Sequence, residues 1–197
     1  MSGTLTAEIA VAAARLIVEE GLEYGAAKRR AARDFRVGRR TVELPDNDVV
    51  EDEVRSYIGL FHADSQPAEL VALRAVAASW MERLAAFRPF LTGAVWRGTA
   101  TRRSSIHIDL YCDDSKAAEL ALIDMRIDYE VSSADGPRGR VFDVLNIFIR
   151  SADLGGVVHV ALTVLDYDDL RGALRVDRRG GSRRGDLAAL QALRATP

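Results

Sequence analysis

The spacing of apolar residues changes once along this chain, between Pro89 and Leu91, and this change limits the fold to a combination of helices and sheet. Before Pro89, apolar residues recur at every third or fourth position, as on one face of a helix. After Leu91 they alternate with polar residues, as in a strand with one buried face. The chain has 197 residues, 48% of them hydrophobic, and is long enough to bury a core. The sequence therefore predicts an α+β protein, with a helical N-terminal half followed by a small mixed β-sheet with flanking helices.

The N-terminal half is predicted to be helical throughout. Helices are expected over residues 7–21, 26–35, 49–61 and 66–88. Thr6 is the expected N-cap of the first helix, and Asp48 is expected to cap the third while Glu51 reaches back in a capping box. The last of these helices carries an apolar stripe from Leu70 to Phe87, and Pro89 ends it.

The C-terminal half is predicted to form the sheet. Strands are expected over residues 106–112, 127–132, 141–149 and 157–165. The segment CDDSKAAELALIDM reads as a capped helix, and the cluster ADGPRG predicts a hairpin between the second and third strands. Further helices are expected over 168–174 and from Asp186, with RRGGSRRG between them as an exposed basic loop. The expected domains are a helical region at 1–90, a sheet domain at 91–175 and a basic loop with a short helix at 176–197.

Charge and cysteine content exclude several classes of protein. Lys and Arg total 27 against 29 for Asp and Glu, so no overall bias toward nucleic acid or acidic membranes is present. The single cysteine, Cys112, cannot form an internal disulfide, and the N-terminus has no signal-peptide pattern. No apolar run approaches the roughly 20 residues that span a bilayer. These observations predict a cytoplasmic protein with no membrane partner.

The segment WRGTATRRSSIHIDLYCDD, residues 96–114, gathers residues suited to phosphate chemistry. Gly98 and Thr99 follow an apolar run, where a turn would expose backbone amides to phosphate oxygens. Arg102 and Arg103 would neutralise phosphate charge. The strand that follows places acidic and imidazole side chains on one face, where a metal ion would sit. A site for a phosphorylated ligand is therefore predicted in this segment.

This pattern resembles the minimal nucleotidyltransferases of the DNA polymerase β superfamily. The matching steps are Gly98-Thr99 for the Gly-Ser of the family, His107-Ile108-Asp109-Leu110 for its two-acid step, and Phe142-Asp143-Val144 for its third acid. The resemblance covers residues 91–175. It implies that Asp109 and Asp143 bind Mg²⁺ or Mn²⁺, that Asp143 helps to activate an acceptor hydroxyl, and that Gly98 with Thr99 holds a nucleoside triphosphate. The implied activity is transfer of a nucleoside monophosphate to an unidentified acceptor.

The histidine at position 107 departs from the family pattern. Imidazole is a poorer partner than carboxylate for magnesium and suits manganese or a softer ion. His107 therefore either modulates the metal as a third catalytic residue, or marks a degenerate protein that binds nucleotide without transferring it. A purely structural alternative also stands, in which His107 and Asp109 lie on a solvated strand face and Asp143 caps a turn or pairs with an arginine.

Two other classes of function stay open. The segment KRRAARDFRVGRR, residues 28–40, would track a phosphate backbone in a nucleic-acid-binding or regulatory module. The acidic segment PDNDVVEDE follows it directly, and the two charge runs would also compensate each other within the fold. In an assembly protein, the stripe from Leu70 to Phe87 would be the interface of a homo-oligomer, although a core helix is the commoner fate of such a stripe.

Overall fold

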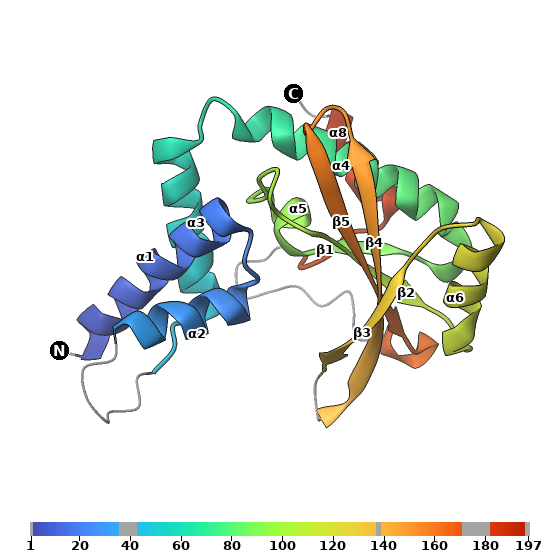
Figure 1. The fold of residues 1–197 in the computed structure, drawn as a ribbon, viewed down its shortest axis with the longest axis horizontal. Coiled ribbons are helices and arrows are strands. Elements are labelled where there is room, and N and C mark those ends of the chain that lie inside the picture. Colours follow the sequence, from blue (N-terminus) through green and yellow to red (C-terminus); the bar gives the residue numbers. More distant parts are fainter. Residues whose placement is uncertain (1, 36–42, 137–138, 171–181, 196–197) are drawn as a thin grey trace.

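The computed structural model describes residues 2–35, 43–136, 139–170 and 182–195, and it confirms the α+β class (Figure 1). Its α-helices are α1 (Ser2–Glu20), α2 (Tyr24–Asp34), α3 (Asn47–Phe61), α4 (Gln66–Arg83), α5 (Gly93–Arg97), α6 (Ser115–Asp124) and α8 (Leu187–Ala195). Short 3₁₀ helices lie at η1 (Ala85–Phe87) and η3 (Tyr167–Asp169). The strands are β1 (Phe90–Thr92), β2 (Ile106–Tyr111), β3 (Glu130–Asp135), β4 (Val141–Ser151) and β5 (Gly156–Leu165).

The five strands form one mixed sheet in the order β1-β2-β5-β4-β3. Strands β2 and β5 run parallel, and every other neighbouring pair is antiparallel. The predicted hairpin between the second and third predicted strands is confirmed as β3 and β4, although β3 begins at Glu130 instead of residue 127. Strand β5 therefore lies between β2 and β4 in the sheet.

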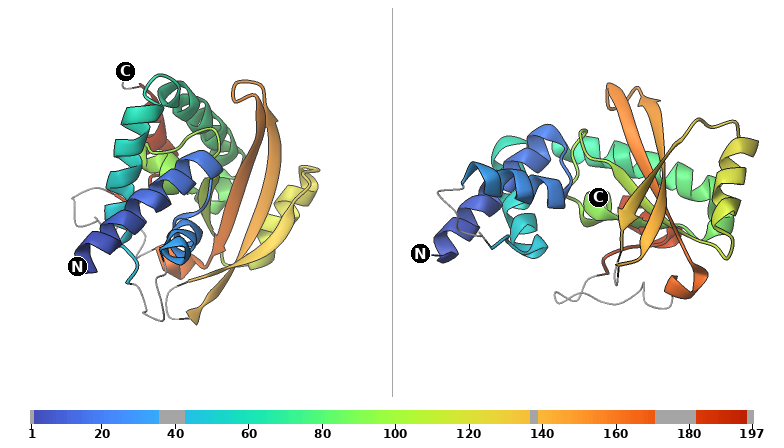
Figure 2. Two further views of the ribbon diagram at one scale, coloured as in Figure 1. Left: turned by 60° about the vertical axis from the view of Figure 1, so that its left-hand side comes forward. Right: turned by 60° about the horizontal axis from the view of Figure 1, so that its bottom comes forward.

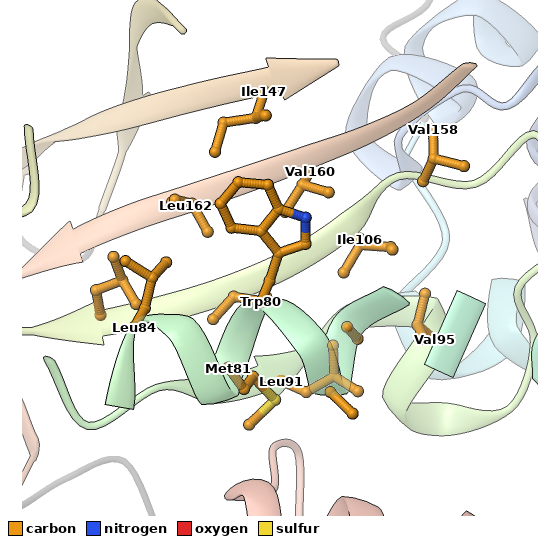
Figure 3. Close-up of a cluster of buried hydrophobic side chains, with 14 of the residues drawn as sticks. Trp80, Met81, Leu84, Leu91, Val95, Ile106, Ile147, Val158, Val160 and Leu162 are labelled. Carbon is orange, nitrogen blue, oxygen red and sulfur yellow. The ribbon is translucent and has the colours of Figure 1, made fainter. Parts of the chain in front are cut away.

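One face of the sheet forms the main core. Side chains of β2 and β5 such as Ile106, Val160 and Leu162 are fully buried, and Trp80 of α4 lies against them (Figure 3). Burying each such side chain contributes about 1.5–3 kcal/mol. The stripe on α4 is thus a core stripe, and helices α6 and α8 complete the same core. We call this the covered face of the sheet.

Helices α1, α2 and α3 pack against each other around a separate core. Ile9, Ala13, Val50 and Val54 are fully buried in it. These three helices lie together beside the sheet, whereas α4 runs along it (Figure 2). Helix α3 therefore belongs to one core and α4 to the other. The predicted domain boundary at residue 90 cuts through the core that the sheet shares with α4.

Two predicted helix caps are wrong. Helix α1 begins at Ser2, so Thr6 lies inside it. Helix α3 begins at Asn47 with Asp46 as its N-cap, so Asp48 lies inside its first turn. Glu51 does not complete a capping box, because Tyr24 of α2, Arg97 of α5 and Thr99 hold its carboxylate.

Three local predictions have different outcomes. The capped helix after β2 is confirmed as α6, where the Asp114 carboxylate accepts a hydrogen bond from the Lys116 amide. In the nucleotidyltransferase pattern an apolar strand leads into the Gly-Ser step, whereas here the run before Gly98 forms the short helix α5. The helix expected over 168–174 falls mostly outside the described residues, and its described start is η3. None of the described helices is long and apolar enough to cross a membrane.

Candidate functional site

The second face of the sheet, which we call the open face, carries the polar residues of β2. Alternation places His107, Asp109 and Tyr111 on it, in register with Ala161, Thr163 and Leu165 of β5. A pocket of about 410 Å³ is hollowed at this end of the face, with Phe142 and Leu165 among its apolar walls. We call it the open-face pocket. Its polar lining residues are Asp109, Tyr111, Thr163, Asp135, Asp169 and Arg184.

Arg184 holds Asp109 at the floor of the open-face pocket. Its Nη1 lies 2.5 Å from Oδ2 of Asp109 and also donates to the Tyr111 hydroxyl. The side chain of Asp109 is 13% exposed, and that of Arg184 is 25% exposed. Burial raises the pKa of Asp109, and the opposing effects of Arg184 and His107 do not cancel it. Burial also raises the pKa of Tyr111, to about 12, so the phenol keeps its proton at neutral pH.

Two polar atoms of residues that line this pocket have no partner among the described residues. They are Nε of Arg184 and Oδ2 of Asp169, and both are buried. The other carboxylate oxygen of Asp169 accepts a hydrogen bond from Arg140 at 2.7 Å. Unpaired buried donors and acceptors cost about 1–3 kcal/mol each, so a ligand that supplies both partners gains by binding here.

The structure does not bring Asp143 beside Asp109. Asp109 is in register with Thr163, which pairs in turn with Val144, so Asp109 and Val144 share the open face. Asp143 precedes Val144 and therefore points to the covered face, where its charge acts on Lys116 of α6. The expectation that both carboxylates meet at one metal site is wrong, because β5 separates their strands and alternation turns their side chains to opposite faces.

The residues present do not fit the implied Mg²⁺ or Mn²⁺ ions. Within the described ranges, no three His, Cys, Asp or Glu side chains converge as a metal-binding group. Oδ2 of Asp109 is paired with Arg184. Two-metal transfer needs carboxylates that bridge the ions, and this donor set does not supply them.

Gly98 and Thr99 have structural roles instead of phosphate contacts. Gly98 ends α5 with φ +83°, a conformation that favours glycine, and its carbonyl accepts from Gln66. The Thr99 amide donates to the Ala94 carbonyl, and its hydroxyl donates to the buried carboxylate of Glu51. Thr99 is 2% exposed, so the expectation that its amide is free for phosphate is wrong.

Arg102 and Arg103 lie away from Asp109, in the turn that precedes β2. They line a separate cavity of about 200 Å³ together with Glu19, His62 and Glu69. The Arg102 amide donates to Glu69, so part of that carboxylate is already occupied. The predicted phosphate residues and the predicted metal residue thus belong to different pockets.

Gly93 is a site residue that the sequence analysis missed. It joins the end of β1 to the start of α5 with φ +70°. A Cβ atom there would lie 3.2 Å from Cδ2 of His107, so the glycine lets the imidazole lie against the strand-helix junction. The detectable signal was the glycine directly after the short β-prone triplet FLT, five residues before Gly98.

Partners from distant segments complete the open face. Glu23, between α1 and α2, lies 2.9 Å from Nε2 of His107. Burial raises the pKa of Glu23, but its hydrogen bond to His107 and the positive charges nearby leave the pKa below its usual range. His159 lies on the same face and contacts Ser105 and Asn146. Nothing in the local sequence around Glu23, His159 or Arg184 indicated these contacts, and Arg184 was expected in an exposed loop.

Part of the basic segment on α2 is occupied by contacts within the protein. Lys28 donates to Asn47 and to the Pro45 carbonyl, and Arg30 pairs with Glu20. Residues 36–42 of the segment lie outside the described ranges. Nucleic-acid binding through this helix therefore stays a prediction, and the geometry adds no support for it.

Comparisons of the chain with protein-family models, with curated proteins and with solved structures gave no match.

Proposed function

We propose that the protein binds a nucleoside or nucleotide in the open-face pocket, as a nucleotidyltransferase-like protein of the degenerate kind. The observation that supports this proposal is that two residues lining the pocket each carry an unpartnered polar atom, Nε of Arg184 and Oδ2 of Asp169. The Watson–Crick edge of a nucleobase presents hydrogen-bond donors and acceptors side by side. A base would therefore accept from Arg184 and donate to Asp169 while its ring lies between apolar walls.

Size and charge agree with this ligand class. A volume of about 410 Å³ lies within the roughly 300–1,000 Å³ of ordinary small-molecule sites. Among the described residues that line the pocket, Asp109, Asp135 and Asp169 are carboxylates and Arg184 is a cation, while Arg140 beside it pairs with Asp169. This balance favours the neutral base and ribose over phosphate inside the pocket, so the phosphates are expected to remain in solvent. Metal-dependent transfer of a nucleoside monophosphate rests on the resemblance alone.

Thermal unfolding with added ligand tests the proposal. We would add the four common nucleosides and their triphosphates, each with Mg²⁺, with Mn²⁺ and with a chelator. A ligand at a hundredfold excess over its Kd stabilises the folded state by about 2.7 kcal/mol, which raises the midpoint by roughly 5–10 °C in a chain of this size. We expect such a rise with at least one base, unchanged by the chelator.

Matched variants locate the ligand. Ala134→Leu adds a side chain to the pocket wall, whereas Ser133→Leu adds it to the neighbouring residue on the other face of β3. We expect only Ala134→Leu to remove the midpoint rise, and we expect Asp143→Asn to leave it intact. No rise with any nucleoside or nucleotide contradicts the proposal, and a rise that requires a divalent ion supports metal-dependent binding instead.

A further inference from the structure

A second set of polar side chains on the open face is arranged as a nucleophile, a base and an orienting group. Ser105 Oγ lies 2.9 Å from Nδ1 of His159, and Nε2 of the same ring lies 2.9 Å from Oδ1 of Asn146. Ser105 immediately precedes β2, while His159 and Asn146 lie on β5 and β4. Three adjacent strands therefore fix the distances between these groups.

The contacts of Asn146 determine which ring nitrogen of His159 carries the proton. Its amide Nδ2 donates to Ser132 Oγ at 2.8 Å and also contacts the Val144 and Glu130 carbonyls. This orientation leaves Oδ1 as the acceptor that faces His159, so Nε2 must hold the hydrogen. In the neutral ring, Nδ1 then presents a lone pair to the Ser105 hydroxyl, which donates to it.

The surroundings of His159 keep the ring neutral and available as a base. Burial lowers its pKa, and the nearby His107 lowers it further, while Glu23 and Glu130 oppose both effects. The Phe148 ring stacks on the imidazole with centroids 4.9 Å apart, which holds its plane. A neutral, oriented imidazole bonded to a serine hydroxyl is the arrangement that activates a serine for nucleophilic attack.

We propose that Ser105 is a nucleophile with His159 as its general base, and that this site cleaves esters of small acyl groups. Ser105 lines a cavity of about 40 Å³ together with Gly93, Ala94 and His107. This space admits a water molecule or a short acyl group such as acetyl, and excludes a long chain. The activity goes beyond nucleoside binding and requires neither a metal ion nor the open-face pocket.

The chemistry follows from the observed hydrogen bonds. The Ser105 proton passes to Nδ1 of His159 as Oγ bonds to the ester carbonyl carbon, and the alcohol leaves with that proton when its C–O bond breaks. Water then attacks the acyl carbon and gives a proton to Nδ1, and the acyl–Oγ bond breaks as that proton returns to Ser105. Asn146 touches no reacting atom and acts as a positioning residue for the imidazole.

Covalent labelling tests this site directly on the full chain. A fluorophosphonate probe forms an Oγ–P bond with an activated serine and releases fluoride, and intact mass followed by peptide mapping locates the label. We expect one label per chain on Ser105 at pH 8, its loss in Ser105→Ala, and no change in Ser56→Ala, which alters an exposed serine of α3. Hydrolysis of p-nitrophenyl acetate is expected to fall at least 100-fold in Ser105→Ala.

Two further variants separate catalysis from structural support. His159→Gln is expected to reduce the labelling rate at least 100-fold while circular dichroism shows a folded protein. Asn146→Asp places a negative charge next to the imidazole, so we expect it to shift the pH at which labelling is half-maximal upward, which a merely structural role would not do. Absence of label in folded wild-type protein, or equal labelling of Ser105→Ala, overturns the proposal.

Discussion

The ion pair between Asp109 and Arg184 makes the sharpest prediction about the open face. Replacing Arg184 by Met removes the cation and leaves a carboxylate whose side chain is only 13% exposed. Breaking a fully buried pair in this way costs about 3–5 kcal/mol, and the partial exposure of both groups reduces our expectation to about 2–3 kcal/mol at pH 7.5. Urea denaturation measures this change in the free energy of unfolding.

The same variant predicts a pH dependence of definite sign. The pKa of Asp109 in the folded protein is raised by burial, so ionising it costs stability as pH rises through that pKa. Loss of Arg184 raises this pKa further. The destabilisation by Arg184→Met should therefore be largest at neutral pH and should shrink toward pH 4, where the protonated carboxyl no longer needs a counterion.

A double-mutant cycle tests whether Asp109 and Arg184 interact. Arg184→Met leaves the Asp109 carboxylate without a counterion, and Asp109→Asn removes that carboxylate's charge. The double variant should therefore be more stable than the sum of the single effects predicts. Arg140→Met serves as the control, because its pair with Asp169 has 49% of the arginine side chain exposed and should contribute under about 1 kcal/mol. Effects of Asp109→Asn and Arg184→Met that add to within about 0.5 kcal/mol would show that the two groups do not interact.

Three further substitutions test the fold around the site. Glu23→Gln removes a carboxylate whose pKa is lowered in the folded protein by its hydrogen bond to His107. The substitution should therefore reduce the free energy of unfolding at pH 7 and have no effect below the pKa of Glu23 in the folded protein. Urea midpoints measured from pH 3 to pH 7 would show this difference. Gly185→Ala places a Cβ 2.1 Å from Cη2 of Trp96, and we expect a loss of about 1–3 kcal/mol by urea denaturation, which an unchanged midpoint would contradict. Gly59→Ala meets nothing within 4 Å on α3, so the same measurement should show a gain of about 0.5–1 kcal/mol from helix propensity.

The local periodicities predicted most of the described elements, but they missed β1 and α5 and did not predict all of the contacts. Alternation along β2 correctly separated Ile108, which is buried on the covered face, from His107 and Asp109 on the open face. A cap at the start of α6 was predicted from the adjacent Asp113 and Asp114, and Asp114 provides it, because both partners lie within the same turn. Such interactions depend on neighbouring residues, which a single sequence displays directly.

Asp109 and Asp143 do not form the predicted metal pair, for two reasons: the alternation of side chains along β4 and the order of the strands. Asp143 and the buried Leu145 are two residues apart on β4, so the alternation that buries Leu145 on the covered face also turns Asp143 there. The sequence already indicated on which face Asp143 lies, because the apolar residues on either side of the motif FDV show which face of the strand is apolar. It did not contain the insertion of β5 between β2 and β4, which follows from how the whole chain packs.

The residues that did reach the open face came from segments with no motif at all. Glu23 approaches His107 because the close contact of Gly21 with the Arg103 carbonyl brings the α1–α2 connection to the turn before β2. Arg184 reaches Asp109 because Leu91 and Gly185 exchange both backbone hydrogen bonds beside β1. Each contact joins residues more than 70 positions apart, so backbone pairing elsewhere, and not the identity of the neighbouring side chains, decides which charges meet. Arg184, which no motif singles out, therefore pairs with Asp109 in the open-face pocket. Arg102 and Arg103, which the motif did single out, lie in another pocket.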